Sequence, residues 1–157
     1  MRPVLLRPAP TAPAGSRDRL RHVSLDPRAL PEAALSFLLE RHLATLSGLR
    51  ADGSIHSVPV GFTWDDATST ARVITSAGTQ KAANVARGSR VTLCQVDGWR
   101  WLTLEGTGQV VDEADRVADA VGRYTARYRP PRANPRRVVL EIAVDRVLGL
   151  VERPAPG

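Results

Sequence analysis

Residues 74–84 hold the only lysine of the chain, Lys81, in a protein whose other permanently cationic side chains are arginines. A β-branched run at 70–75 precedes the lysine and a breaker-free run at 80–87 follows it. The first run predicts a strand and the second a short helix, with small turn residues between them. Free amides at a helix N-terminus and a nearby lysine favour an anion such as a cofactor phosphate. A plain strand-to-helix corner with one surface lysine fits the local pattern equally well.

No nucleophile–base pair or metal site is predicted elsewhere. The three histidines, His22, His42 and His56, do not have metal-ligand spacing, and Cys94 lies in the middle of an expected strand. A chain that is poor in acid–base groups and rich in anion-binding ones favours a bound cofactor that carries the reaction. We therefore expect no catalytic side chain and no metal.

Length and composition are those of one soluble globular domain. The 157 residues are 43% hydrophobic and 24% charged, and no apolar run approaches the roughly 18 residues that span a bilayer. The N-terminus lacks the apolar segment and cleavage site of a signal peptide. A single cysteine excludes an internal disulfide and fits a reducing cytoplasm. We expect a cytoplasmic protein without membrane contact.

A net charge of +6 raises the question of nucleic acid. The arginines are spread along the chain, however, and aromatic residues do not interleave with them as in a base-stacking platform. General enrichment in arginine and binding of a small anionic molecule are the two remaining interpretations. We expect no nucleic-acid partner.

Two regions are expected from the order of local patterns. Residues 1–28 contain five prolines and no sustained period, which predicts a flexible or loosely docked tail. Residues 29–152 form the expected domain, with helices at 30–42, 80–87 and 112–128; His42 ends the first helix and Asp112 caps the third. The predicted strands are 43–50, 55–64, 70–75, 90–96, 99–111 and 138–144, the last with an extension at 147–151 after a bend at 145–146.

Short hairpins dominate the connections between these strands, and the first three read as a meander. Six such strands with flanking helices favour a closed antiparallel barrel, a mainly β fold. Pro59 and Gly61 are unusual within a strand and indicate an edge, a bulge or a backbone that a ligand approaches closely. Gly106 and Gly108 suggest a strong bend in the strand at 99–111.

Several segments resemble one known family. They are FLLERH at 37–42, LRAD at 49–52, VGFT at 60–63, ARVIT at 71–75, QKA at 80–82, QVDG at 95–98, RWLTLEG at 100–106, YRPPRANPRRVV at 128–139 and RVLG at 146–149. Together they are similar to the pyridoxamine-phosphate-oxidase-like split β-barrel proteins, and most closely to the deazaflavin-dependent branch that reduces biliverdin with coenzyme F420. The resemblance covers 30–149 and implies a six-stranded, FMN-binding-like split β-barrel that forms a homodimer.

The resemblance also implies where the cofactor binds. Its phosphate would lie at the strand end and helix start, at Ile74, Thr75, Gln80 and Lys81. Its ring system would lie along His56, Ser57, Val58, Pro59 and Val60. The turn Asp97, Gly98, Trp99 and Arg100 would contact it, in the family's dimers from the partner subunit. Pyridoxamine-phosphate oxidases carry an Arg-Lys pair where this chain has Gln80-Lys81, which favours F420 and leaves FMN as the alternative.

The implied activity is hydride transfer from reduced F420 to an organic acceptor, with biliverdin, which gives bilirubin, as the favoured one. Two alternatives stay open: an FMN-dependent oxidase of the pyridoxamine-phosphate type, and a non-catalytic module that binds flavin, deazaflavin or haem. The arginines at 129–137 would either meet the polyglutamate tail of F420 or only solvate a loop.

Overall fold

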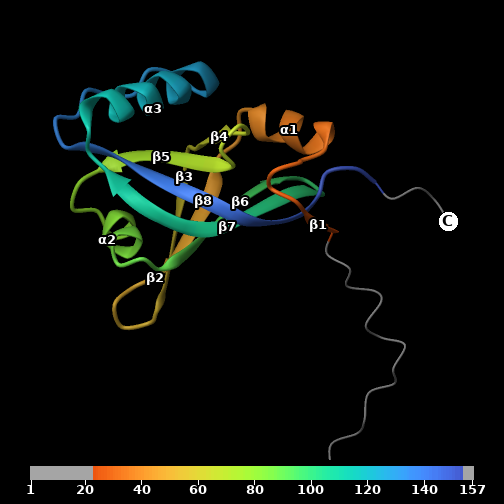
Figure 1. Ribbon diagram of the computed structural model, residues 1–157, viewed down its shortest axis with the longest axis horizontal. Coiled ribbons are helices and arrows are strands. Elements are labelled where there is room, and N and C mark those ends of the chain that lie inside the picture. The colour runs from red at the N-terminus through yellow and green to blue at the C-terminus, as the bar shows by residue number, and fades with distance from the viewer. Residues whose placement is uncertain (1–22, 154–157) are drawn as a thin grey trace, which may run out of the picture.

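A computed structural model describes residues 23–153, which form eight strands and three helices (Figure 1). In chain order the elements are β1 (Val23–Leu25), α1 (Glu32–Leu39), β2 (Ala44–Leu49), β3 (Ile55–Val60), β4 (Thr63–Asp65), β5 (Thr70–Ser76), α2 (Gln80–Ala86), β6 (Arg90–Asp97), β7 (Arg100–Val111), α3 (Ala114–Arg127) and β8 (Arg137–Leu150).

All strands join one antiparallel sheet in the order β3-β2-β6-β7-β8-β5-β4, with β1 paired to β8. The predicted mainly β antiparallel fold is confirmed. Two strands, β1 and β4, were not foreseen, and the hydrogen-bonded order ends at β3 and β4, so the ladder of the described residues is open where a closed barrel was expected. The predicted meander holds in part: the first half of the expected strand at 55–64, β3, pairs with β2, and its last residues, β4, pair with β5, but β3 and β4 lie at opposite ends of the strand order.

Gly61 explains why the expected strand at 55–64 is two strands. A Cβ at Gly61 would lie 2.7 Å from Cε2 of Tyr124 and 3.1 Å from Cε2 of Tyr128. Two aromatic rings from α3 and its end therefore press on the backbone here. The chain leaves β3 after Val60 and resumes in β4, which pairs with β5. The close approach expected at Gly61 was that of a ligand, and within the described residues the rings of Tyr124 and Tyr128 occupy this position.

Strands β7 and β8 form the longest ladder, and a bulge bends it. Glu105 pairs with Arg146 and Gly106 pairs with Val144, so Asp145 is the extra residue. A Cβ on Gly106 would lie only 2.0 Å from the Ala143 carbonyl oxygen, which is why a glycine stands there. The predicted bends at Gly106 and at 145–146 are therefore one feature, and β8 continues through it to Leu150.

Side chains from every layer fill the core, and the largest fully buried ones are Phe37, Leu38, Phe62, Leu93, Leu102, Leu104, Leu140 and Ile142. Helix α1 ends at Leu39, three residues before His42, because Glu40 adopts an extended ψ of 147°. Helix α3 is capped at Glu113 and not at Asp112, without a side-chain cap bond. None of the helices within residues 23–153 is long and apolar enough to cross a membrane.

Helix α3 rests on the sheet through charges more than through apolar packing, since Ala120 is its only buried residue. Under it, Arg72 bonds to Asp65 at 2.9 Å and to Glu141 at 3.4 Å. Arg116 of α3 also pairs with Glu141, and Arg123 lies 3.6 Å from Asp65. Burial is the largest single effect and raises the pKa of the Asp65 carboxyl, but the hydrogen bonds from Arg72 and Thr68 and the charges of Arg123 and Arg72 together outweigh it, so the net pKa is lowered. The helix is therefore held by a cross-linked set of ions.

Strand β1 lies inside the segment expected as a tail. Val23, Ser24 and Leu25 pair with Gly149, Leu148 and Val147 of β8. The Ser69 hydroxyl donates a 2.9 Å hydrogen bond to the Pro27 carbonyl. Residues 1–22, the rest of the expected tail, lie outside the described part of the chain.

Candidate functional site

The corner around Lys81 has the predicted strand–turn–helix form. Strand β5 ends at Ser76, Gly78 turns with a φ of +82°, and α2 begins at Gln80. Thr79 donates its hydroxyl proton to the Ser76 carbonyl at 3.1 Å. Its oxygen also lies 3.4 Å from the hydroxyl of Thr75. Lys81 is half-buried, and its ammonium has no ion pair or hydrogen bond within residues 23–153. Within residues 23–153, a half-buried cation without a partner thus stands in the first turn of the helix, two residues after Thr79.

An open groove of about 710 Å³ begins at the same corner, where Ser76 lines its wall. The loop after α3 forms the rest of the wall and brings in Arg129, Arg132 and Arg137. This loop is fastened to the corner, because Asn134 Nδ2 donates to Ser76 Oγ at 2.7 Å. The guanidinium groups of Arg129 and Arg132 have no partner among the described residues. Ser76 therefore belongs both to the corner and to the groove that the predicted arginine cluster lines.

Strand β3 lies at one end of the sheet order, so one backbone edge has no strand beside it. Paired positions alternate between bonded and non-bonded along an antiparallel ladder. Because the Arg50 N–H donates to the Ser54 carbonyl at 2.8 Å, Pro59 falls in a non-bonded pair with Thr45. The absent N–H of Pro59 would face the open edge, and the proline costs the sheet no bond. Pro59 is at an edge, one of the places predicted for it.

Side chains of β3 divide between two faces. His56, Val58 and Val60 share the face of the core, and Val60 is buried. Ser57 and Pro59 lie on the outer face, where the Ser57 and Ser47 hydroxyls are 2.7 Å apart. The five residues predicted along the ring thus do not present one common surface of side chains. What they share is the free edge of the strand.

Asn84 connects β3 to α2, a contact that was not predicted. Its side chain is 2% exposed. Gln80 Nε2 donates to its Oδ1 at 2.8 Å, and Arg87 Nη2 donates to the same oxygen at 2.9 Å. Its Nδ2 lies 3.4 Å from His56 Nδ1. An asparagine in the middle of an alanine-rich helix was the available signal, because that residue type is poor in helix interiors unless its side chain is bonded.

The turn from Asp97 to Arg100 lies at the far end of the sheet from Lys81. Arg100 opens β7, whereas Val111 closes β7 and pairs with Val139, which in turn pairs with Ile74 near the corner. Within one chain the structure therefore separates the turn from the corner at residues 74–81 (Figure 1). Val60 of β3 lies nearer the turn, because it pairs with Ala44, which pairs with Gln95 of β6. Trp99 at the tip is 43% exposed, and the Arg153 guanidinium lies 5.4 Å from its ring centroid.

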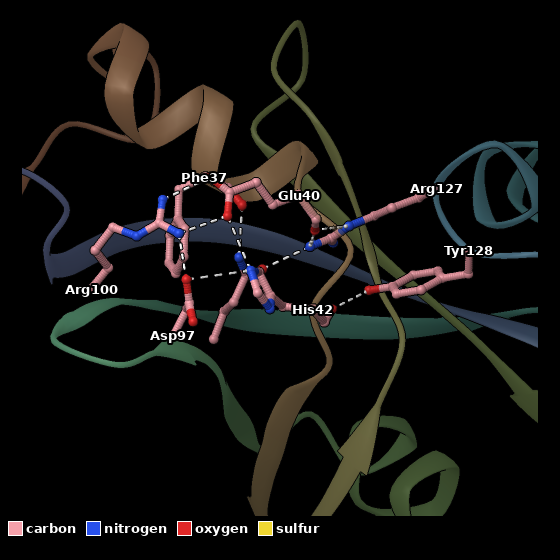
Figure 2. Close-up of polar contacts among 8 residues, drawn as sticks. Phe37, Glu40, His42, Asp97, Arg100, Arg127 and Tyr128 are labelled. Atoms are coloured by element: carbon pink, nitrogen blue, oxygen red, sulfur yellow. Dashed lines mark hydrogen bonds and ion pairs between the residues drawn. The ribbon is translucent and has the colours of Figure 1, made fainter.

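Arg100 is occupied by carboxylates. It donates to both oxygens of Glu40, at 2.7 and 2.8 Å, and also to Asp97 (Figure 2). The pKa of the Glu40 carboxyl is lowered to about 2, and the hydrogen bonds from Arg100 are the largest cause. His42 Nε2 lies 3.0 Å from Glu40 and 3.8 Å from Asp97. At the end of the first helix, the imidazole of His42 was expected to meet exposed backbone carbonyls. It contacts the carboxylates of Glu40 and Asp97 instead. Glu40, His42 and Asp97 have metal-ligand atoms within 4.8 Å of one another, but Arg100 already provides the cation between both carboxylates.

The same loop after α1 accepts bonds from the end of α3. Arg127 donates to the carbonyls of Glu40, at 2.7 and 3.1 Å, and of Phe62, at 2.5 Å (Figure 2). Tyr128 donates to the His42 carbonyl at 2.7 Å. The Tyr128 oxygen also accepts from the Phe62 N–H at 3.2 Å. Burial lowers the pKa of the Arg127 guanidinium and raises that of the Tyr128 phenol. These bonds fix the crossing from β3 to β4.

Comparison with known proteins supports the family that the sequence motifs indicate. A family model described as pyridoxamine 5'-phosphate oxidase matches residues 30–150. Over 120 residues the chain is 58% identical to the F420H2-dependent biliverdin reductase of Mycobacterium tuberculosis, which covers 76% of this chain and 88% of that protein.

Solved structures share the fold. A conserved hypothetical protein from Mycobacterium tuberculosis superposes with a TM-score of 0.66 at 22% identity, over 82% of this chain and 94% of that one. A protein named F420 reductase gives a TM-score of 0.62 at 22% identity, over 75% and 98%. Because the family model spans most of the described residues and the curated relative is more than half identical, the chain belongs to the pyridoxamine 5'-phosphate oxidase family.

Proposed function

We propose that this protein is an F420H2-dependent reductase that converts biliverdin to bilirubin. The observation that carries the proposal is the 58% identity, over most of both chains, to a protein with that activity. Bound reduced F420 would supply the hydride. The chain's own residues bind and orient the two reactants and keep water from them, which is where most of the protein's contribution to such a reaction lies.

The residues at the corner fit an anionic group of the coenzyme. Lys81 offers a half-buried ammonium with no partner among the described residues, and Thr75 and Thr79, whose hydroxyl oxygens lie 3.4 Å apart, offer hydroxyls in the same strand–turn–helix corner. Ile74 precedes Thr75 near the end of β5, and Gln80 opens the helix. Charge-assisted bonds to a phosphate are about twice as strong as neutral ones. We assign the coenzyme phosphate to Lys81 and the two hydroxyls.

Gln80 bears on the choice between F420 and FMN. Its side-chain nitrogen already donates to Asn84, so it adds no charge to the corner. A corner with one cation, followed by a groove containing Arg129 and Arg132, suits a ligand whose negative charges are spread along its length. F420, with a phosphate and a carboxylate tail, has that distribution, which favours it over FMN. The ring system would then lie along the free edge from His56 to Val60.

A second copy of the chain is the proposed partner. The outer face of β2 and β6 forms a continuous patch without charge, because Thr45 pairs with Cys94 and Ser47 with Thr92. Exposed Val96 and Leu49 lie on the same strands. Two such faces packed together would form a homodimer and would allow the turn Asp97, Gly98, Trp99 and Arg100 to reach the partner's coenzyme. In this arrangement Trp99 is the contact residue and Arg100 holds the turn. We place the dimer in the cytoplasm, where its free Cys94 stays reduced.

The test is a titration of the purified protein with F420 and with FMN, followed by an assay of F420H2 oxidation with biliverdin as acceptor. We expect F420 to bind more tightly than FMN, and bilirubin to appear with one equivalent of oxidised coenzyme. Tight binding of F420 without turnover of biliverdin or any other acceptor would instead support a carrier module. FMN-dependent oxidation of pyridoxamine phosphate would support the oxidase alternative.

A further inference from the structure

Arg87 sets the direction of a chain of hydrogen bonds that ends at His56. A guanidinium can only donate, so the Asn84 atom 2.9 Å from Arg87 Nη2 must be the amide oxygen. The same Arg87 nitrogen donates to the Leu49 carbonyl at 2.6 Å, which anchors it on β2. With the oxygen identified, the Gln80 atom 2.8 Å from it must be the amide nitrogen. One donor-only group thereby assigns both amides without reference to any ligand.

The remaining end of the Asn84 amide is its nitrogen, and it faces His56 Nδ1 at 3.4 Å. An amide nitrogen can only donate, so Nδ1 must be the acceptor and carry no proton. The proton of the neutral imidazole then resides on Nε2. His56 Nε2 has no hydrogen-bond partner within residues 23–153. The imidazole therefore presents a free N–H donor, held in one tautomer by a buried side chain.

Packing makes this arrangement specific. His56 pairs in register with Gly48, and a Cβ on Gly48 would lie 3.8 Å from the Asn84 amide nitrogen and 3.1 Å from Val91. Asn84 of α2 therefore packs within van der Waals reach of Gly48 on β2, next to the imidazole. Since Asn84 is buried, replacing its donor leaves no water to take over the bond to Nδ1.

We propose that Asn84 is a positioning residue for coenzyme binding: it holds His56 as the Nε2–H tautomer so that this N–H donates to a carbonyl oxygen of the deazaflavin ring along β3. The contact part of this proposal rests on the proposed function. The tautomer part concerns the free protein alone. His56 would thus recognise the ring by a donor of fixed polarity, and Gln80 and Arg87 would act through Asn84.

The tautomer is tested by long-range ¹H–¹⁵N correlation of the histidine rings in the free protein, with His56→Gln used to assign the signals. We expect His56 to show the Nε2–H pattern in the wild type. In Asn84→Asp the carboxylate can only accept, so the pattern should change to a protonated Nδ1. A wild-type His56 with its proton on Nδ1 would overturn the proposal, whatever the protein binds.

The contact is tested by F420 titration of two histidine variants that retain different atoms. Glutamine places an amide nitrogen near the position of Nε2, whereas asparagine reaches only as far as Nδ1. His56→Asn and Asn84→Asp should each weaken F420 roughly three- to tenfold, the range for one lost hydrogen bond, while His56→Gln stays near wild type.

Equal affinities of all three variants, in a wild type that binds F420, would overturn the proposal and leave the proposed function standing. Failure of the wild type to bind F420 would instead overturn the proposed function and the contact. Circular dichroism and thermal unfolding of each variant separate lost binding from a lost fold. His42→Asn is the matched control, because its ring contacts Glu40 and Asp97 and not Asn84, and we expect its F420 affinity to be unchanged.

Discussion

The guanidinium of Arg100 and the carboxylate of Glu40 form a two-bond pair, at 2.7 and 2.8 Å, that fastens the β6–β7 hairpin to the end of α1. Arg100 was predicted to contact a cofactor directly. Its donors are instead directed at Glu40 and Asp97, while its planar group stacks 4.7 Å from the centroid of Phe37. Trp99, next to it, is the side chain left exposed.

Glu40→Gln should lower stability at neutral pH by roughly 1 kcal/mol or less, because the side chain is 38% exposed and water screens the pair. The folded pKa of Glu40, about 2, is below its ordinary value of 4.5. A carboxyl whose pKa is lower in the folded state stabilises the folded protein at pH values above its unfolded pKa. This stabilisation is lost as pH falls from about 4.5 to about 2. Urea unfolding at several pH values should show the two proteins converging over that range. Exposed Glu152→Gln is the control, and a constant difference down to pH 2 would contradict the assignment.

Lys81→Ala should weaken F420 binding strongly while leaving the fold intact. A charge-assisted contact with a phosphate is worth about 1.5–3 kcal/mol, so affinity should fall about ten- to 150-fold. Fluorescence titration measures the loss, and thermal unfolding checks the fold. Arg28→Ala removes a cation that is 87% exposed and should bind as wild type does. An unchanged affinity for Lys81→Ala would remove the phosphate from this corner.

Tyr128→Phe should destabilise the protein by about 1–3 kcal/mol, because it deprives the buried His42 carbonyl and the Phe62 N–H of a shared hydroxyl. Tyr124→Phe is a matched control on the same helix face, since its hydroxyl has no partner within residues 23–153. Denaturant unfolding of the two variants should therefore differ clearly. Equal effects would show that the hydroxyl of Tyr128 does not support the crossing from β3 to β4.

Gly61→Ala should destabilise by about 1–3 kcal/mol, because the new methyl group would meet the Tyr124 ring at 2.7 Å. Combination with Tyr124→Leu should recover part of the loss. Gly122→Ala provides the contrast, since no atom lies within 4 Å of a Cβ there and the residue is inside α3. That change should stabilise by about 0.5–1 kcal/mol. Thermal unfolding of the three variants measures these effects. A Gly61→Ala variant as stable as the wild type would show that the Tyr124 ring does not exclude a side chain at this position.

Deletions can locate the functional N-terminal boundary. Removal of residues 1–22 should leave F420 affinity and stability close to those of the full chain. Removal of 1–28 also takes away β1 and the carbonyl of Pro27 that Ser69 bonds, and we expect a lower melting temperature. A large loss of turnover in the shorter deletion would assign a function to residues 1–22.

The sequence patterns predicted the features that depend on interactions between neighbouring residues. The corner at 70–87 was foreseen with its strand, turn and helix, because β-branched residues, Gly78 and an alanine-rich run each act within a few neighbours. The break at Gly61 was not, since its cause is the ring of Tyr124, distant in sequence. Asn84 was missed for the same reason: its bond to His56 exists only once α2 is packed on β2. Likewise, Arg100 looked free until the fold brought Glu40 to it.

Strand β8 lies between β7 and β5, and within residues 23–153 no other strand pairing joins the β3-β2-β6-β7 group to the β5-β4 hairpin. It is also the last described strand to be synthesised. On the ribosome, the two parts of the sheet therefore wait as separate, unsupported pieces until residues 137–150 emerge. Completion of the core is then a late event with long-range contacts, which are slow to form. Chaperones that shield exposed sheet edges would bind the chain during that interval.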